Sequence, residues 1–451
     1  MKEIVIFGIG YYMMHNVPKI NLNQYKIRYL CDNDPDKWGK TYHVVEDIIC
    51  ISPEELKSRA GNIPVCIAVE SQKTYHAIAE QLDKMNVKHL YIKELLEEHK
   101  DAYEKSQIAA YKKKYERCVM PKEPLTMHHF IDCFLPLDFC NLSCDYCYVG
   151  QSEKYQRQAM FVHSPEFIAH ALGIHRLGGT SFINLCSDGE TMLYPGIVEI
   201  AEQLIKQGHF VQIVTNGTVS KELKKLGKLK KEILDQLMMK FSLHYLELKK
   251  RNLLEVFAEN VMWLYDQGAS ITIELVPYDD LEPYIDEIVV YCEEQFGAKP
   301  HLTVTRDEST SEYKIFTSHT KEEFYQIWRG FDCAMFEIKM DKVYKRYSTC
   351  RAGELSYVFN MGTGQLYQCN GNELLMNLYD NLTMELEVKP VMDQCKNPYC
   401  YNCHSFLSIG VIDEVMDAPT YFEVRNRKMK GGRNWVHKKA AEYFSLKLKR
   451  N

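Results

Sequence analysis

The chain has 451 residues, a formal net charge of -6 and 46% hydrophobic residues. This length exceeds what one ordinary hydrophobic core accommodates, so we expect two or three domains. The small negative charge gives no reason to expect a nucleic acid partner, and no segment has the roughly 20 apolar residues that span a bilayer. The apolar run at the N-terminus lacks the length and cleavage site of a signal peptide, so we expect a cytoplasmic protein.

The first 97 residues predict a small doubly wound α/β domain. Short apolar runs at 4–7, 27–31, 64–69 and 89–92 alternate with helical or polar segments. Strands that alternate with helices in this way form a parallel sheet.

This first domain also has part of a dinucleotide-binding pattern. Its first strand ends in Gly-Ile-Gly at 8–10, and Asp32 or Asp34 stands where a ribose-binding acid is expected. Met13 occupies the place of the third glycine, which argues against a nicotinamide-dependent enzyme. Segments 31–35 and 51–56 resemble Rossmann-like domains found beside enzymes of sugar and cell-surface glycan metabolism. The sequence leaves two roles open for this domain. It binds a nucleotide or nucleotide sugar, or it has a purely structural or docking role.

The rest of the chain falls into four segments. Residues 98–124 are charged and helical in pattern, which indicates a solvated helical linker. Residues 125–330 again alternate strands and helices. Residues 331–415 predict a small cysteine-rich domain, and residues 416–451 predict a basic surface tail that ends in a helix.

Cys140, Cys144 and Cys147 lie within eight residues and indicate a metal centre, because disulfides are rare in a reducing cytosol. Thiolates at this spacing can reach one metal group from a single loop. A structural zinc site requires a fourth ligand, and no Cys or His follows within a dozen residues. Three ligands on a four-iron cube leave one iron open to a small molecule. Zinc is the alternative at this site.

The pattern Cx3CxΦC, with the aromatic Tyr146 before its last cysteine, resembles the signature of the radical SAM superfamily. This resemblance implies a partial (β/α)6 barrel over 125–330 and a [4Fe–4S] cluster on the three cysteines. It implies that the open iron binds S-adenosylmethionine (SAM) and that Tyr146 packs near the adenine. It also implies a flavodoxin- or ferredoxin-type reductant.

Further segments resemble SAM-binding motifs in the order that the family requires. The turn Ser-Asp-Gly-Glu at 187–190 occupies the place of a Gly-Gly-Glu motif, so the resemblance assigns Gly189 and Glu190 to the methionyl ammonium. Asp188 replaces the first glycine. The strand at 211–214 leads to Thr-Asn-Gly-Thr, which assigns Asn216 to the cofactor, and Ser242 is assigned to the ribose by its position.

Candidates for substrate contact lie where the later strands end. Active sites of such barrels gather at the C-terminal ends of the strands. His244, Glu274 and Arg306 are therefore candidates, with a structural or surface role as the alternative for each.

A second group of cysteines follows the barrel. Cys350 and Cys369 bracket a Cx(9–15)Gx4C segment that resembles the opening of SPASM and twitch domains, and Cys400 and Cys403 add a Cys-x-x-Cys pair. The resemblance implies one auxiliary [4Fe–4S] cluster on these four residues, with Cys395 as an alternative ligand. The cysteines are too few for a full SPASM domain, which favours the shorter twitch arrangement. Four thiolates also suit zinc.

Together these features predict a radical SAM oxidoreductase. It would cleave SAM reductively to a 5′-deoxyadenosyl radical and abstract hydrogen from a substrate C–H bond, with the auxiliary cluster in electron transfer. A carbohydrate or nucleotide-linked small molecule, such as a nucleotide sugar, is the favoured substrate, because the N-terminal domain resembles domains of sugar metabolism. A peptide or protein substrate is one alternative, and a zinc-stabilised binding protein without catalytic activity is another.

Overall fold

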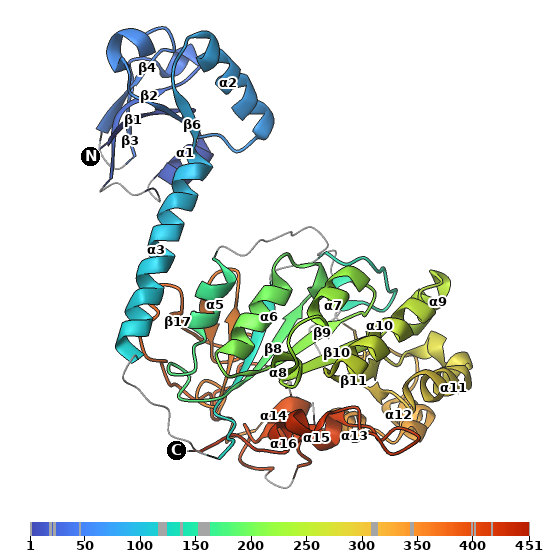
Figure 1. Ribbon diagram of the computed structural model, residues 1–451. Helices are drawn as coiled ribbons and strands as arrows, with labels where there is room; N and C mark the ends of the chain where they lie inside the picture. The colour runs from blue at the N-terminus through green and yellow to red at the C-terminus, as the bar shows by residue number, and fades with distance from the viewer. Residues whose placement is uncertain are drawn as a thin grey trace. The chain divides into compact units, whose positions relative to one another are not determined.

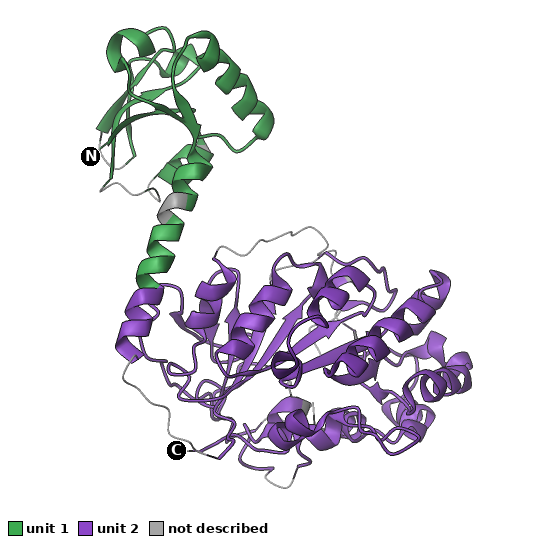
Figure 2. Cartoon of the chain, viewed as in Figure 1, with its two compact units in different colours: residues 1–107 green, residues 108–451 purple. Residues whose placement is uncertain are grey.

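The computed structural model describes residues 2–17, 20, 24–44, 47–115, 124–135, 139–151, 163–307, 314–342, 347–397, 400, 403–415 and 418–450. The chain forms two compact units, Met1–Gln107 and Ile108–Asn451 (Figure 2). Their boundary lies inside one long helix, α3 (Ile92–Tyr115), where the sequence predicts a helical linker. Within the described ranges, no helix is long and apolar enough to cross a membrane.

The first unit is built on a six-stranded sheet in the order β3-β4-β2-β1-β5-β6. Its pairings are parallel except that β3 runs antiparallel to β4. Each face of the sheet carries a cluster of hydrophobic side chains, and each cluster includes residues from both strands and helices. This is the α/β arrangement that the sequence predicts. The elements are β1 (Lys2–Phe7), α1 (Tyr11–Asn16), β2 (Tyr25–Cys31), β3 (Thr41–His43), β4 (Asp47–Ile51), β5 (Val65–Ile67), α2 (Gln72–Lys84) and β6 (His89–Tyr91).

Asp32, a predicted ribose ligand, instead closes the glycine turn of this unit. Its Oδ2 accepts hydrogen bonds from the Ile9 amide at 2.6 Å and from Lys37 Nζ at 3.1 Å. Its Oδ1 accepts one from the Asp34 amide at 2.9 Å. The carboxylate is buried and used by the turn itself, so its contacts are those of a structural residue.

The second unit is built on a nine-stranded sheet in the order β12-β11-β10-β9-β8-β7-β15-β16-β17 (Figure 1). Strands β7 to β12 are parallel and adjacent in chain order, which is the open, partial barrel that the sequence predicts. The strands are β7 (Phe130–Leu135), β8 (Phe182–Ser187), β9 (Phe210–Thr215), β10 (Leu237–Leu243), β11 (Ser270–Leu275) and β12 (His301–Leu302). The connecting helices include α5 (Pro165–Ala171), α6 (Ile197–Lys206), α7 (Ser220–Leu226), α10 (Leu254–Gln267) and α11 (Ile285–Phe296).

The predicted cysteine-rich segment begins as an extension of the same sheet. Strand β15 (Ser356–Asn360) pairs with β7 in parallel, and β16 (Gln365–Tyr367) and β17 (Leu374–Asn377) continue the sheet antiparallel. The first cysteine loop follows β7, and β15, from the second cysteine-containing segment, lies directly beside β7. The two segments that carry the cysteine groups therefore share neighbouring strands of one sheet.

One face of the barrel sheet is lined by polar side chains. Asp132, Asn184 and Gln212 stand opposite one another in β7, β8 and β9. Asn184 Nδ2 donates to Asp132 Oδ1 at 2.8 Å, and Gln212 Nε2 donates to Asn184 Oδ1 at 2.7 Å. Since alternate residues of a strand share a face, the register extends this surface along β8, β10 and β11. We call it the polar face: Asp132, Asn184, Cys186, Gln212, Lys240, Ser242 and Glu274.

The C-terminal segment packs against the beginnings of the barrel strands. It contains α13 (Ala334–Lys342), α14 (Cys403–Ile409), α15 (Tyr421–Arg425) and α16 (Lys438–Phe444). The rings of Tyr421 and Phe444 each lie 4.9 Å from that of Phe182, and Tyr421 donates a hydrogen bond to Gln212 Oε1 at 2.9 Å. Arg425 is 1% exposed. The prediction of a basic surface tail is therefore wrong at Arg425, because this part of the segment closes one end of the polar face.

Glu274, a predicted substrate contact, is held in a buried ion-pair network. Its Oε2 lies 2.5 Å from Arg425 Nη1, and its Oε1 lies 3.1 Å from Lys240 Nζ. We expect Glu274→Gln to lower the free energy of unfolding by about 3–5 kcal/mol, because it leaves the buried guanidinium without its counter-charge. Urea denaturation followed by circular dichroism measures this effect.

A surface ion pair provides the matched control for that measurement. Asp235 pairs with the exposed Lys231 at 2.7 Å, and we expect Asp235→Asn to cost less than about 1 kcal/mol. Equal losses in the two variants would contradict a structural role for Glu274.

Candidate active site

Cys140, Cys144 and Cys147 lie on the loop that joins β7 to the short helix α4 (Tyr148–Gln151), at the C-terminal edge of the barrel sheet. All three are half-buried thiols without a disulfide partner. Burial raises the pKa of Cys140 to about 11, with Glu190 and Cys147 adding to the effect. Burial also raises the pKa of Cys144, and the charges of Cys147 and Cys140 raise it further. The three thiols therefore lie close enough for their charges to interact, and a bound metal group would offset their mutual repulsion as thiolates.

Amide groups surround the first of these thiols. The Leu142 amide lies 3.4 Å from Cys140 Sγ, and Asn216 Nδ2 lies 3.8 Å from it. Asn216 Nδ2 also donates to Asn141 Oδ1 at 2.9 Å, and Asn141 Nδ2 donates to Thr218 Oγ1 at 2.8 Å. Asn216, a predicted cofactor residue, is thus placed beside a predicted cluster ligand. Hydrogen bonds to sulfur are one means by which a protein sets the potential of an iron–sulfur cluster.

Glu190 is enclosed by hydrogen bonds from its own surroundings. It is 2% exposed, and its Oε1 accepts from the Met192 amide at 2.9 Å and from Thr215 Oγ1 at 2.6 Å. Its Oε2 accepts from the Asn216 amide at 2.6 Å, and its own amide donates to Phe139 O at 3.0 Å. The pKa of this carboxyl is raised overall, because the effect of burial is larger than the lowering effect of these hydrogen bonds. Glu190 therefore ties the 187–190 turn to β9 and to the cysteine loop.

Tyr146 joins the cysteine loop to the end of β10. Its hydroxyl lies 2.5 Å from His244 Nδ1, and its ring lies 4.4 Å from that of Tyr278. Burial lowers the pKa of His244 to about 4, so the imidazole is neutral at pH 7. His244, predicted to contact the substrate, contacts the aromatic residue of the cysteine motif.

The other predicted site residues lie around the same edge of the sheet. Gly189 is half-buried, and its carbonyl accepts a hydrogen bond from Ser187 Oγ at 2.9 Å. Ser242 is half-buried on the polar face, opposite Glu274 in the register. The side chain of Arg306 lies outside the part of the chain that the structure describes.

In the second cysteine group, Cys350, Cys369 and Cys395 lie close enough for their charges to interact. Burial raises the pKa of Cys369, and the charges of Cys350 and Cys395 raise it further. Burial raises the pKa of Cys350 to about 11, again with a contribution from Cys395. A backbone hydrogen bond from the Met392 amide to Cys350 O, 2.7 Å long, aligns the two segments. Cys395, predicted only as an alternative ligand, thus lies with two of the predicted ligands.

The remaining predicted ligands are less fully described. Cys400 is half-buried and forms no disulfide. Cys403 begins α14, and its side chain is outside the described residues. The assignment of the Cys400–Cys403 pair to the second group therefore stays a prediction.

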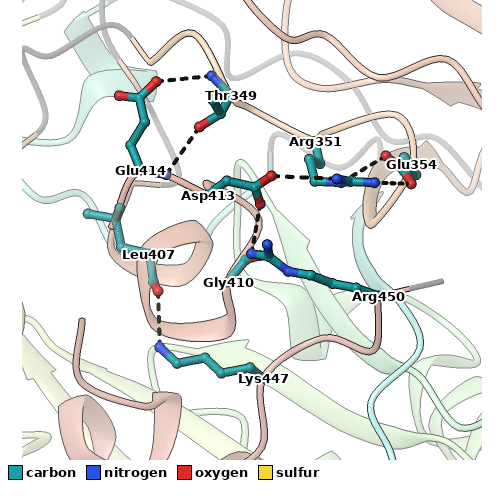
Figure 3. A network of polar contacts seen from close by, with 9 residues as sticks. All are labelled: Thr349, Arg351, Glu354, Leu407, Gly410, Asp413, Glu414, Lys447 and Arg450. Atoms are coloured by element: carbon teal, nitrogen blue, oxygen red, sulfur yellow. Dashed lines mark hydrogen bonds and ion pairs between the residues drawn. The ribbon is translucent and has the colours of Figure 1, made fainter. Parts of the chain in front are cut away.

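A polar network joins Thr349 and Arg351, the two chain neighbours of Cys350, to the segment that follows α14 (Figure 3). On one side of Cys350, the Thr349 amide donates to Glu414 Oε1, and the Glu414 amide donates to Thr349 Oγ1, both at 3.1 Å. On the other side, Arg351 Nη1 lies 3.5 Å from Asp413 Oδ2. Contacts on both sides of Cys350 hold the chain at this residue against the segment that follows α14.

Residues 134–276 match the family model described as the radical SAM superfamily. The chain contains a radical SAM domain. The match begins in β7, includes the three-cysteine loop and ends just after β11. Radical SAM domains use a [4Fe–4S] cluster and SAM, which agrees with the cofactors predicted for Cys140, Cys144 and Cys147. Three thiols on one loop, with two amide groups near Cys140 Sγ, fit such a cluster.

Solved structures with a similar arrangement include Streptococcus suis SuiB bound to S-adenosylmethionine, with a TM-score of 0.43 and 15% identity over 69% of this chain and 75% of that chain. Native anSMEcpe with bound AdoMet has a TM-score of 0.42 and 15% identity, over 58% of this chain and 82% of that one. UDP-D-quinovosamine 4-dehydrogenase from Vibrio fischeri is 22% identical over 20% of this chain and 76% of that one, with a TM-score of 0.17. TM-scores this low support no conclusion about the substrate of this chain. No curated protein matches the sequence.

Sequence reasoning missed two charged residues of the radical SAM domain's polar face, Asp132 and Lys240. A signal for each was present, because both interrupt otherwise apolar strands, and a charged residue inside such a strand is rarely buried without a role. Tyr278, which packs on Tyr146, carried no such signal, since its position depends on the fold.

Proposed function

We propose that this protein is a radical SAM oxidoreductase that abstracts hydrogen from a C–H bond of a carbohydrate or nucleotide-linked small molecule. The observation that carries the proposal is the position of three half-buried thiols on one loop within the radical SAM domain, at the C-terminal edge of the barrel sheet. Three thiol ligands from one loop leave a four-iron cluster with one iron for a small molecule.

When bound, the cluster and SAM supply a 5′-deoxyadenosyl radical. The chain's own residues hold and orient them. Cys140, Cys144 and Cys147 are the cluster ligands, and the Asn216 amide lies beside the first of these sulfurs. Tyr146, fixed by its hydrogen bond to His244, is the residue we assign to the adenine. By position we assign Ser242 to the ribose and Gly189 to the methionyl group. A flavodoxin- or ferredoxin-type protein would supply the electron.

The polar face supports a hydroxylated substrate over a hydrocarbon one. Asp132, Asn184 and Gln212 form a hydrogen-bonded row across three strands, and the Lys240 side chain on the same face is 16% exposed. Such side chains recognise hydroxyl and charged groups.

The polar face also connects the radical SAM site with the second cysteine group. Burial raises the pKa of Cys186 to about 12, with Asp132 the next cause, and Asp132 also contributes to the raised pKa of Cys369. Asp132 therefore lies close enough to both Cys186 and Cys369 for its charge to act on their thiols.

We propose that the second group holds one auxiliary [4Fe–4S] cluster that accepts an electron from the substrate. An alcohol that loses a hydrogen atom from carbon becomes a hydroxyalkyl radical. Loss of one electron to the auxiliary cluster and of the hydroxyl proton to a base or water gives the carbonyl. Cys350 and Cys369 are proposed ligands, with the remaining ones among Cys395, Cys400 and Cys403.

The test uses anaerobically reconstituted protein, dithionite, SAM and a panel of nucleotide sugars deuterated on the sugar, with short peptides as a second panel. We expect 5′-deoxyadenosine that carries deuterium from one sugar substrate, measured by mass spectrometry. Deuterium transfer from a peptide alone would contradict the proposed substrate class. Protein that binds zinc and forms no 5′-deoxyadenosine would contradict the enzymatic function itself.

A further inference from the structure

An imidazole and two carboxylates lie together beyond the end of β11. Asp279 and Glu282 belong to the short 3₁₀ helix Asp279–Tyr284. His319 lies in the loop that precedes α12 (Lys321–Trp328). One ligand atom from each of the three lies within 4.8 Å of the other two, and all three residues are half-buried. None of them belongs to either cysteine group, and the proposed SAM chemistry uses none of them.

The contact between Glu282 and His319 differs from an ordinary ion pair. Glu282 Oε1 lies 2.8 Å from His319 Nε2, yet this oxygen is buried and has no hydrogen-bond partner within the described part of the chain. The exposed pair His43 and Asp47, by contrast, forms a hydrogen bond of 2.9 Å. Neighbouring ligands of one ion, each about 2.1 Å from it, lie about 3 Å apart and donate nothing to each other. The Glu282–His319 contact has that character.

The third residue, Asp279, is oriented by the loop that carries His319. Its Oδ2 accepts hydrogen bonds from the Ser318 amide at 2.8 Å and from Ser318 Oγ at 2.7 Å. Its Oδ1 accepts one from Thr317 Oγ1 at 2.5 Å and keeps a second lone pair. Carboxylates that bind a metal are fixed by outer hydrogen bonds of this kind. The loop therefore supplies one ligand atom and holds another in place.

We propose that Asp279, Glu282 and His319 bind one divalent transition-metal ion. An imidazole with two carboxylates suits Zn²⁺ or Mn²⁺, whereas Mg²⁺ and Ca²⁺ prefer oxygen ligands alone. Opposite ligands of such an ion lie about 4.2 Å apart, so a small shift of these half-buried side chains closes the site. Three protein ligands leave room for water as a fourth.

The ion would join two segments beside the candidate active site. Tyr278 directly precedes Asp279, and its ring lies 4.4 Å from that of Tyr146 in the cysteine loop. A metal bound to Asp279, Glu282 and His319 ties the segment that carries Tyr278 to the 317–319 loop. Because the ion binds the folded chain, it also stabilises that chain.

The experiment titrates Mn²⁺ into full-length protein with reconstituted clusters, after removal of loosely bound metal. Thiolates favour softer ions than Mn²⁺, and electron paramagnetic resonance measures the Mn²⁺ that stays free. We expect one Mn²⁺ bound per chain and its displacement by Zn²⁺. His319→Gln and Glu282→Gln should each weaken Mn²⁺ binding by at least about tenfold, because loss of an outer partner alone costs about 10- to 100-fold. Mn²⁺ should raise the melting temperature of the wild-type protein but not of these variants.

The matched control is His43→Gln, which removes the exposed histidine–carboxylate contact of the first unit. This variant should bind Mn²⁺ with wild-type affinity. Unchanged Mn²⁺ affinity in both His319→Gln and Glu282→Gln would overturn the proposal, and so would the lack of saturable Mn²⁺ binding by the wild-type protein. The measurement requires neither SAM nor turnover, so its failure leaves the proposed radical chemistry untouched.

Discussion

Replacing Cys140, Cys144 and Cys147 together by alanine should remove about four irons per chain and abolish 5′-deoxyadenosine formation. The three thiols lie on one loop, and the family match identifies that loop as part of a radical SAM domain. Without them no iron is left for SAM to bind. Colorimetric iron and sulfide counts on reconstituted protein, with mass spectrometry of the SAM products, measure both effects.

A buried cysteine outside both groups is the matched control for that variant. Cys292 is fully buried in α11, and Cys292→Ala should keep every iron and the full rate of SAM cleavage, with a modest loss of stability from the cavity. If the triple variant kept its iron content, or still formed 5′-deoxyadenosine, the loop would not be the cluster site.

Changing Cys369 to alanine should remove the auxiliary cluster and leave the cluster on Cys140, Cys144 and Cys147 in place. We expect about four irons to remain and SAM to be cleaved, while conversion of the substrate falls by at least about tenfold. The structure places this thiol beside Cys350 and Cys395 and within reach of the charge of Asp132, so the variant removes the electron acceptor but not the radical source. Iron counts and electron paramagnetic resonance of the reduced protein distinguish the two clusters.

Single variants then identify the ligands of the second group. We expect Cys395→Ala to reduce auxiliary iron, because this thiol lies with Cys350 and Cys369. Full auxiliary iron in Cys395→Ala, with loss in both Cys400→Ala and Cys403→Ala, would instead support the ligand set drawn from the sequence. Zinc in place of iron at this group would contradict the proposed electron transfer.

The sequence predicted the parts of the site that depend on local spacing. Three cysteines within eight residues define their own loop, and alternating strands and helices define a parallel sheet with a known functional edge. The structure has this loop and this parallel sheet. Within the loop, Tyr146 contacts His244, and Asn216 lies beside Cys140.

The parts that sequence did not resolve depend on contacts between distant segments. Arg425 lies among basic residues and reads as a surface charge, yet its partner Glu274 is 151 residues earlier. Glu190 matches a ligand-binding motif, but its enclosure depends on Thr215 and Asn216 at the end of the next strand. The position of Cys395 follows from the pairing of its segment with Cys350, which no local pattern indicates.

The most direct test of the account is the metal content of anaerobically reconstituted wild-type protein, measured together with its reductive cleavage of SAM. The account predicts about eight irons, a matching amount of sulfide, and 5′-deoxyadenosine formed only when dithionite and SAM are both present. Two zinc ions per chain, little iron and no 5′-deoxyadenosine would contradict it and would identify a metal-stabilised binding protein.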